Sequence, residues 1–199
     1  MKTVNSTPYT HDQVMAIAEQ QIGKHSLATR LAYEAGVKAC EIASLRPPLV
    51  RTVDLTSRYD HQLFSGRKDI VIYTIENRDG ISRQIAVSES LAQDLEAVRL
   101  RCPVTVEEGG WRRLCGYDIG HGHAWVHNFA EASDIALGFS YGTQGLRHAY
   151  IRERMQELSD LGFSPEDRVA VIAIETGLKP GSIERYIKLG RSSPARHVA

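Results

Sequence analysis

The sequence predicts a mostly helical α+β fold in which helices surround one small antiparallel β-sheet. Apolar residues recur at helical spacing over most of the chain, and glycines interrupt the last third near positions 138, 162 and 177. The stretch "DIVIYTIENRDGISRQIAV", residues 69–87, instead has the composition of two strands joined by a turn. With 199 residues, 42% of them hydrophobic, the chain is long enough to bury a core of its own.

The predicted elements follow from start, stop and turn signals along the chain. Thr10 is a candidate N-cap, because Gln13 follows three residues later and apolar residues come next, a pattern typical of a capping box. The other predicted elements are helices over 26–35 and 39–45, a hairpin turning at Asp79-Gly80, a helix over 88–101, a loop over 102–123 and helices from Ala124 onward. They predict one domain over residues 1–190, followed by a loose tail over 191–199.

Composition narrows the function classes. No apolar run approaches the roughly 20 residues of a membrane span, and the N-terminus has no apolar signal core, so we expect a soluble, cytoplasmic protein. The 24 basic and 24 acidic side chains balance, which neither indicates nor excludes nucleic-acid binding. Three irregularly spaced cysteines, and the histidines of "GHGHAWVH" without partner ligands at a recognised spacing, predict no metal site. No cofactor is expected.

The stretch "TQGLRHAYIRER", residues 143–154, raises the first functional question. Gln144, Arg147, His148 and Ile151 recur at helical spacing and share one face. That face combines an amide, a guanidinium, an imidazole and an apolar side chain. Arg147 is therefore either a surface charge or a group held in a cleft to bind a phosphate.

Four short motifs, in this order along the chain, resemble the catalytic domain of the tyrosine recombinases, the phage integrase family. They are "AGVKACEIASL" (35–45), "RDGISRQIAV" (78–87), "QGLRHAYI" (144–151) and "ETGLKPGSIERY" (175–186). The resemblance implies that Tyr186 attacks a DNA phosphate and forms a 3′-phosphotyrosyl link, while Lys38, Arg78, Gln144 and Arg147 complete the catalytic set. Forked donors and a covalent nucleophile suit such a phosphoryl transfer.

The resemblance further implies double-stranded DNA as the partner, with self-association on the DNA. The side chains expected to contact DNA are Lys38, Arg78, Arg83, Arg147, His148, Arg185 and Lys188. Lys38, Arg78, Gln144, Arg147 and Tyr186 are expected to line one basic concavity, with His148 packed beneath Arg147. The N-terminal core-binding domain of the family is expected to be absent, which leaves fewer phosphate contacts.

Several family positions carry a different chemistry in this sequence. Lys38 replaces an arginine and cannot bind a phosphate through two parallel donors. Arg78 replaces a lysine and is a poor proton donor. Gln144 and Gly177 replace histidines, so neither position exchanges a proton.

Three hypotheses remain open at the level of the sequence. The first is a DNA-binding protein of a mobile genetic element that has the recombinase fold but lost or reduced strand-exchange activity. The second is an active, atypical recombinase, integrase or relaxase-like nicking enzyme that uses Tyr186. The third is a helix-turn-helix regulator, in which the helices around Gly177 bind DNA and the recombinase pattern is incidental.

Overall fold

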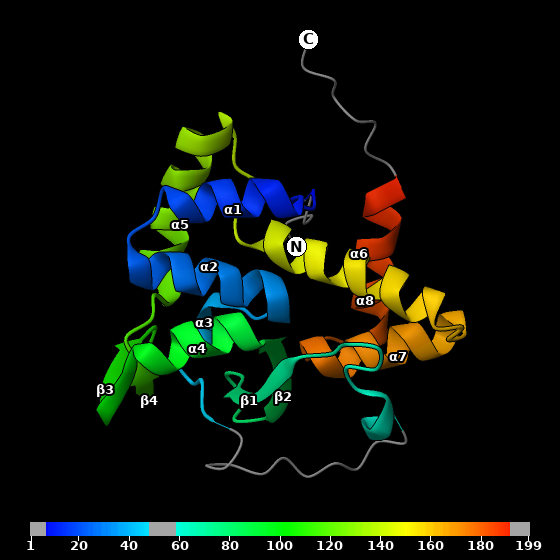
Figure 1. Ribbon diagram of the computed structural model, residues 1–199, viewed down its shortest axis with the longest axis horizontal. Coiled ribbons are helices and arrows are strands. Elements are labelled where there is room, and N and C mark those ends of the chain that lie inside the picture. Colours follow the sequence, from blue (N-terminus) through cyan, green and yellow to red (C-terminus); the bar gives the residue numbers. More distant parts are fainter. Residues whose placement is uncertain (1–6, 48–58, 192–199) are drawn as a thin grey trace.

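The computed structural model describes residues 7–47 and 59–191 (Figure 1). The elements in chain order are α1 (His11–Glu19), α2 (Gly23–Ala35), α3 (Ala39–Ile42), the 3-10 turn η1 (Asp60–Gln62), β1 (Ile70–Glu76), β2 (Ser82–Ser88), α4 (Glu89–Ala97), β3 (Arg99–Glu108), β4 (Trp111–Tyr117), α5 (Gly122–Leu137), α6 (Gln144–Asp160), α7 (Pro165–Thr176) and α8 (Pro180–Arg191). The fold is therefore mostly helical with small antiparallel sheets, as the sequence predicts. None of the helices in the described part is both long and apolar enough to cross a membrane.

The helices form two groups that meet along α2 and α6. Helix α1 packs on α2 and α5, whereas α7 and α8 pack on α6, as Figure 1 shows. The two hairpins lie below the helices in that view, and each forms a separate two-stranded sheet. The end of α2, the start of α6 and the end of α7 come together where the two groups meet.

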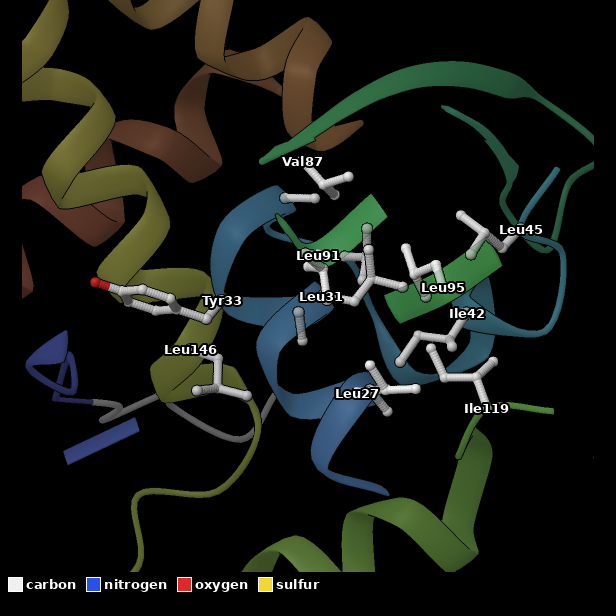
Figure 2. Close-up of a cluster of buried hydrophobic side chains, with 14 of the residues drawn as sticks. Leu27, Leu31, Tyr33, Ile42, Leu45, Val87, Leu91, Leu95, Ile119 and Leu146 are labelled. Carbon is white, nitrogen blue, oxygen red and sulfur yellow. The ribbon is translucent and has the colours of Figure 1, made fainter. Parts of the chain in front are cut away.

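The larger hydrophobic core gathers buried residues of α1, α2, α4, α5 and the first hairpin, and part of it lies between α2 and α4. Figure 2 shows Leu27 and Leu31 of α2 facing Leu91 and Leu95 of α4, and Leu31, Leu91 and Leu95 are fully buried. Burial of each such leucine contributes about 1.5–3 kcal/mol. A second core, which includes Leu158, joins α6, α7 and α8.

Local signals predicted several boundaries correctly. The capping box at α1 is confirmed, because the Gln13 amide donates to the Thr10 hydroxyl at 3.3 Å and the Thr10 amide donates to the Gln13 side chain at 3.0 Å. Gly36 ends α2 at φ +60°, a left-handed conformation that favours glycine. The first hairpin is confirmed as β1 paired with β2.

The predicted loop over 102–123 is wrong, and so is the prediction of a single sheet. Strands β3 and β4 occupy most of that range and pair with each other, not with β1 or β2. Only the inner end of β4 is buried, so the sequence lacks the alternation that marks a half-buried strand. Helices α3 and α4 are also shorter than predicted. The predicted tail lies outside the described residues apart from Arg191, the last residue of α8.

A fully buried ion pair connects α6 and α7. The Glu175 carboxylate accepts hydrogen bonds from Nε and Nη2 of Arg154 at 3.0 Å, and both side chains are inaccessible to solvent. Glu175 also accepts from the Phe64 amide at 2.8 Å and the Tyr150 hydroxyl at 2.9 Å. The carboxylate thereby ties η1 and its following turn to the C-terminal helices.

We expect Arg154→Ala to lower the free energy of unfolding by about 3–5 kcal/mol, because it leaves a buried carboxylate without its counter-charge. Urea unfolding followed by circular dichroism measures the change. Arg30→Ala is the matched control: Arg30 pairs with Asp94 at 2.6 Å, but the two side chains are 25% and 49% exposed. That variant should lose less than about 1 kcal/mol. Equal losses in both variants would contradict the buried-pair account.

Candidate functional site

One cavity of about 370 Å³ gathers side chains from distant parts of the chain. Lys38, Arg78, Gln144, Arg147 and Tyr186 all line it. They come from the turn before α3, the turn of the first hairpin, the first turn of α6 and the middle of α8. The structure thus brings the five side chains of the predicted catalytic set to one place.

Arg147 lies at the floor of this cavity and is 5% exposed. Its Nε donates to the Gly36 carbonyl at 2.7 Å, and its Nη2 donates to the Thr176 carbonyl at 2.9 Å. These carbonyls end α2 and α7, where helices have unsatisfied acceptors and a partial negative charge. Within the described parts of the chain, no hydrogen-bond partner takes Nη1.

Glu41 provides the counter-charge beneath the cavity and is 1% exposed. It accepts from Arg83 at 2.8 Å and from Arg147 at 3.5 Å, and it also accepts from the backbone amide of Lys38 at 2.8 Å. One carboxylate therefore orients both buried arginines and the backbone of Lys38, the N-cap residue of α3.

The structure corrects the expectation that Arg83 contacts DNA. Arg83 is 8% exposed, and its Nη1 donates to the Glu175 carbonyl at 3.0 Å while Nη2 binds Glu41. Gly177 makes room for it, because a Cβ at that position would lie 2.8 Å from Arg83 Nε. Gly177 also ends α7 at φ +62°. Arg83 is thus a structural cross-link, and Gly177 has a packing role.

Positive potential reaches the cavity from the backbone as well as from side chains. The first turn of α5 (Gly122 and His123) and the first turn of α6 (Thr143 and Gln144) line it. The N-terminus of a helix carries a partial positive charge and unsatisfied amides, which favour an anion. A chain with no net charge therefore has one cavity whose lining side chains and helix ends are positive.

The ionisation of Lys38 and Arg147 reflects their surroundings. Lys38 is an exposed residue, but partial desolvation of its ammonium lowers the pKa, and the nearby positive charge of Arg147 lowers it further, while Glu41 opposes the shift. Burial lowers the pKa of the Arg147 guanidinium to about 10, so it stays charged at neutral pH. Lys38 is therefore a better proton donor than an ordinary lysine.

Tyr186 is half-buried at the edge of the cavity, and its ring packs on that of His148. The two ring centroids lie 5.3 Å apart at an interplanar angle of 64°, an edge-to-face arrangement. His148 is 2% exposed, so the expectation that it contacts DNA is corrected: it supports Tyr186 from below. Arg185 and Lys188 are exposed on α8, outside the cavity lining.

Sequence reasoning missed Cys40, Thr143 and His123 as cavity residues. His123 belongs to the "GHGHAWVH" cluster, which the sequence places in a loop leading into a helix, whereas the structure places it in the first turn of α5. No spacing rule identifies His123, because its neighbours in the cavity are distant in sequence. By contrast, His127 of the same helix is exposed, and its Nδ1 lies 3.4 Å from Oε2 of Glu131.

Comparisons with known proteins identify the fold. No protein-family model matches the chain, and no curated protein does. Among solved structures, a XerH site-specific recombinase bound to palindromic difH substrate in a post-cleavage complex matches with a TM-score of 0.55, at 12% identity, over 94% of this chain and 50% of that one. XerA recombinase matches with a TM-score of 0.55, at 12% identity, over 90% of this chain and 59% of that one. A pre-cleavage complex of XerH with difH matches with a TM-score of 0.56, at 10% identity, over 90% of this chain and 50% of that one.

The chain therefore has the fold of a tyrosine recombinase catalytic domain and spans about half the length of these recombinases. This fold argues against the third hypothesis, in which the recombinase pattern is incidental. Helices α7 and α8 do flank a turn at Gly177, but Ile183 and Tyr186 of α8 pack into the core with α6 and α7.

Two charge-removing substitutions test the electrostatics of Lys38. Arg147→Ala should raise its pKa toward the usual lysine range, because a neighbouring positive charge is removed. Glu41→Gln should lower it further, because the favourable negative charge is lost. An NMR titration of the lysine side-chain signals, with Lys38 assigned from Lys38→Arg, measures both. Shifts of the same sign in the two variants would contradict this account.

Proposed function

We propose that this protein binds DNA through the cavity, which holds a backbone phosphate, and that its strand-exchange activity is lost or much reduced. One observation carries the proposal: five side chains from distant segments line a single cavity, and one of them, the buried Arg147, has a donor nitrogen that is unpaired among the described residues. A guanidinium held in this way, beside the positive ends of two helices, suits a phosphate.

Reduced chemistry follows from the residue types at the site. Proton transfer by a positioned side chain contributes roughly 100- to 10,000-fold to a rate, and Gln144 and Gly177 provide none. Lys38 offers a point charge where a forked donor would neutralise two phosphate oxygens. Binding requires only the positive charge, so these replacements weaken catalysis far more than they weaken attachment to DNA.

DNA as the ligand is also supported by the structural neighbours, since both XerH structures are complexes with the difH substrate. This chain spans half the length of those proteins. Each phosphate that the cavity and its surroundings bind releases counterions from the DNA, so the affinity should fall as the salt concentration rises. Two copies side by side on a duplex would add phosphate contacts. A regulatory or accessory role on mobile-element DNA fits such an attachment.

We expect a salt-sensitive complex with a fluorescent duplex of about 30 bp, measured by anisotropy at low salt. Gln144→Glu places a negative charge at the cavity and should weaken binding about tenfold or more, which corresponds to about 1.4 kcal/mol. Gln156→Glu is the matched control, because Gln156 is also an exposed glutamine of α6 but does not line the cavity. Absence of binding, or equal affinities of the two variants, would refute the cavity as the phosphate site.

A second function, an active atypical recombinase, is favoured by His123. This imidazole lines the same cavity as Tyr186 and Lys38, although it comes from α5 and not from the family's histidine positions. In this reaction the Tyr186 oxygen bonds to phosphorus and releases its proton to His123. The phosphorus–5′-oxygen bond breaks, and the leaving oxygen takes a proton from Lys38.

A nicked suicide substrate, built on DNA selected from a random library with the protein, tests this reaction. We expect a covalent adduct on denaturing gels that disappears in Tyr186→Phe and forms about 100-fold or more slowly in His123→Asn. His127→Asn, an exposed histidine of the same helix, should leave the rate unchanged. If the selected DNA binds but no adduct forms, the protein is a binding protein only.

A further inference from the structure

The second hairpin, β3–β4, is fixed against the turn of the first. Arg113 of β4 donates to the Asn77 carbonyl at 2.5 Å and pairs with the Glu76 carboxylate at 3.3 Å. Its side chain is only 10% exposed, and Arg46 also donates to the Leu114 carbonyl. The outer end of the hairpin is therefore held next to Arg78, which follows Asn77 in the chain.

Trp111 lies at that outer end, directly after the turn at Gly109 and Gly110, and is 48% exposed. It lines a small pocket together with Cys40, Arg78 and Arg113. Cys40 and Arg78 also line the main cavity, so the surface around Trp111 continues from the phosphate site. Arg113 is engaged by Glu76 and Asn77, but Arg78 is exposed. An indole that remains half-exposed beside Arg78 is available to a ligand that has both flat apolar faces and negative charge.

Nucleic acid has both properties. Bases stack on exposed aromatic side chains whatever their sequence, and arginines bind the flanking phosphates. A base offers its face only where it is not stacked between its neighbours in the duplex. A strand that places a phosphate in the cavity would extend past Arg78 toward Trp111.

We propose that the β3–β4 hairpin is a second nucleic-acid contact, in which Trp111 stacks on an unpaired base next to the phosphate held in the cavity. This inference rests on the proposed DNA binding. It assigns a role to a hairpin that contributes no residue to the predicted catalytic set. It also makes DNA with an unpaired segment the preferred ligand.

Intrinsic fluorescence reports on this contact directly, because the chain has two tryptophans. Trp125 is fully buried and donates to the Thr29 hydroxyl at 3.0 Å, so it is shielded from DNA. A duplex of about 30 bp with a short central gap should quench the wild-type emission. The same DNA should not quench Trp111→Phe, whose remaining tryptophan is Trp125. The intact duplex should quench the wild type less than the gapped one.

Affinities for the gapped duplex, measured by anisotropy, complete the test. Trp111→Ala should bind about tenfold more weakly, the loss expected for one base–aromatic stack, whereas Trp111→Phe should stay close to wild type because it keeps an aromatic face. Ile135→Ala is the control, since Ile135 is 72% exposed at the far end of α5. Circular dichroism verifies that every variant is folded.

The outcomes separate the two proposals. If the gapped duplex binds without quenching the wild-type emission, and Trp111→Ala binds it as tightly as the wild type, the hairpin contact is overturned and DNA binding stands. If no variant, wild type included, binds either duplex, both proposals fail. Equal losses in Trp111→Ala and Ile135→Ala also overturn the hairpin contact.

Discussion

The buried contact between Arg147 and Glu41 holds the rest of the site in place. An unpaired guanidinium in the interior would be strongly destabilising. Here Arg83 and Arg147 share the Glu41 carboxylate and also donate to backbone carbonyls at the ends of α2 and α7. The negative ends of those helices and one carboxylate roughly offset two cationic side chains. The helices and the arginines therefore stabilise one another, and neither arrangement would persist alone.

This contact decides the electrostatics of the cavity. Arg147 binds the carbonyls at the negative ends of α2 and α7, whereas the positive ends of α5 and α6 line the cavity itself. The field in the cavity is set by the cationic side chains and helix ends that line it, so the zero net charge of the chain says little about it. The buried position of Arg83 also explains the glycine at position 177. At the end of α7, next to the Arg83 side chain, there is no space for a Cβ.

The first and second hairpins differ in how far the sequence predicts them. Strands β1 and β2 each bury residues of the core, so their apolar, β-branched composition and the Asp79-Gly80 turn identify them. Strands β3 and β4 cover little of the core, and most of β3 is exposed on both faces. Hydrophobic periodicity reports burial and not strand pairing, which is why residues 102–117 resemble a loop in sequence and residues 99–101 resemble the end of the preceding helix. The contact of Arg113 with the first hairpin depends on this undetected element.

The sequence by itself determined the fold class, the start of α1, the first hairpin and the glycines that end helices, because these follow from local propensities and short-range patterns. The order of the four motifs also indicated which polar side chains form the candidate site. The tertiary structure alone decided that Arg83 is buried, that His123 lines the cavity and that Trp111 lies beside Arg78. Those placements depend on helix ends and strands distant in sequence meeting in space, which no local pattern encodes.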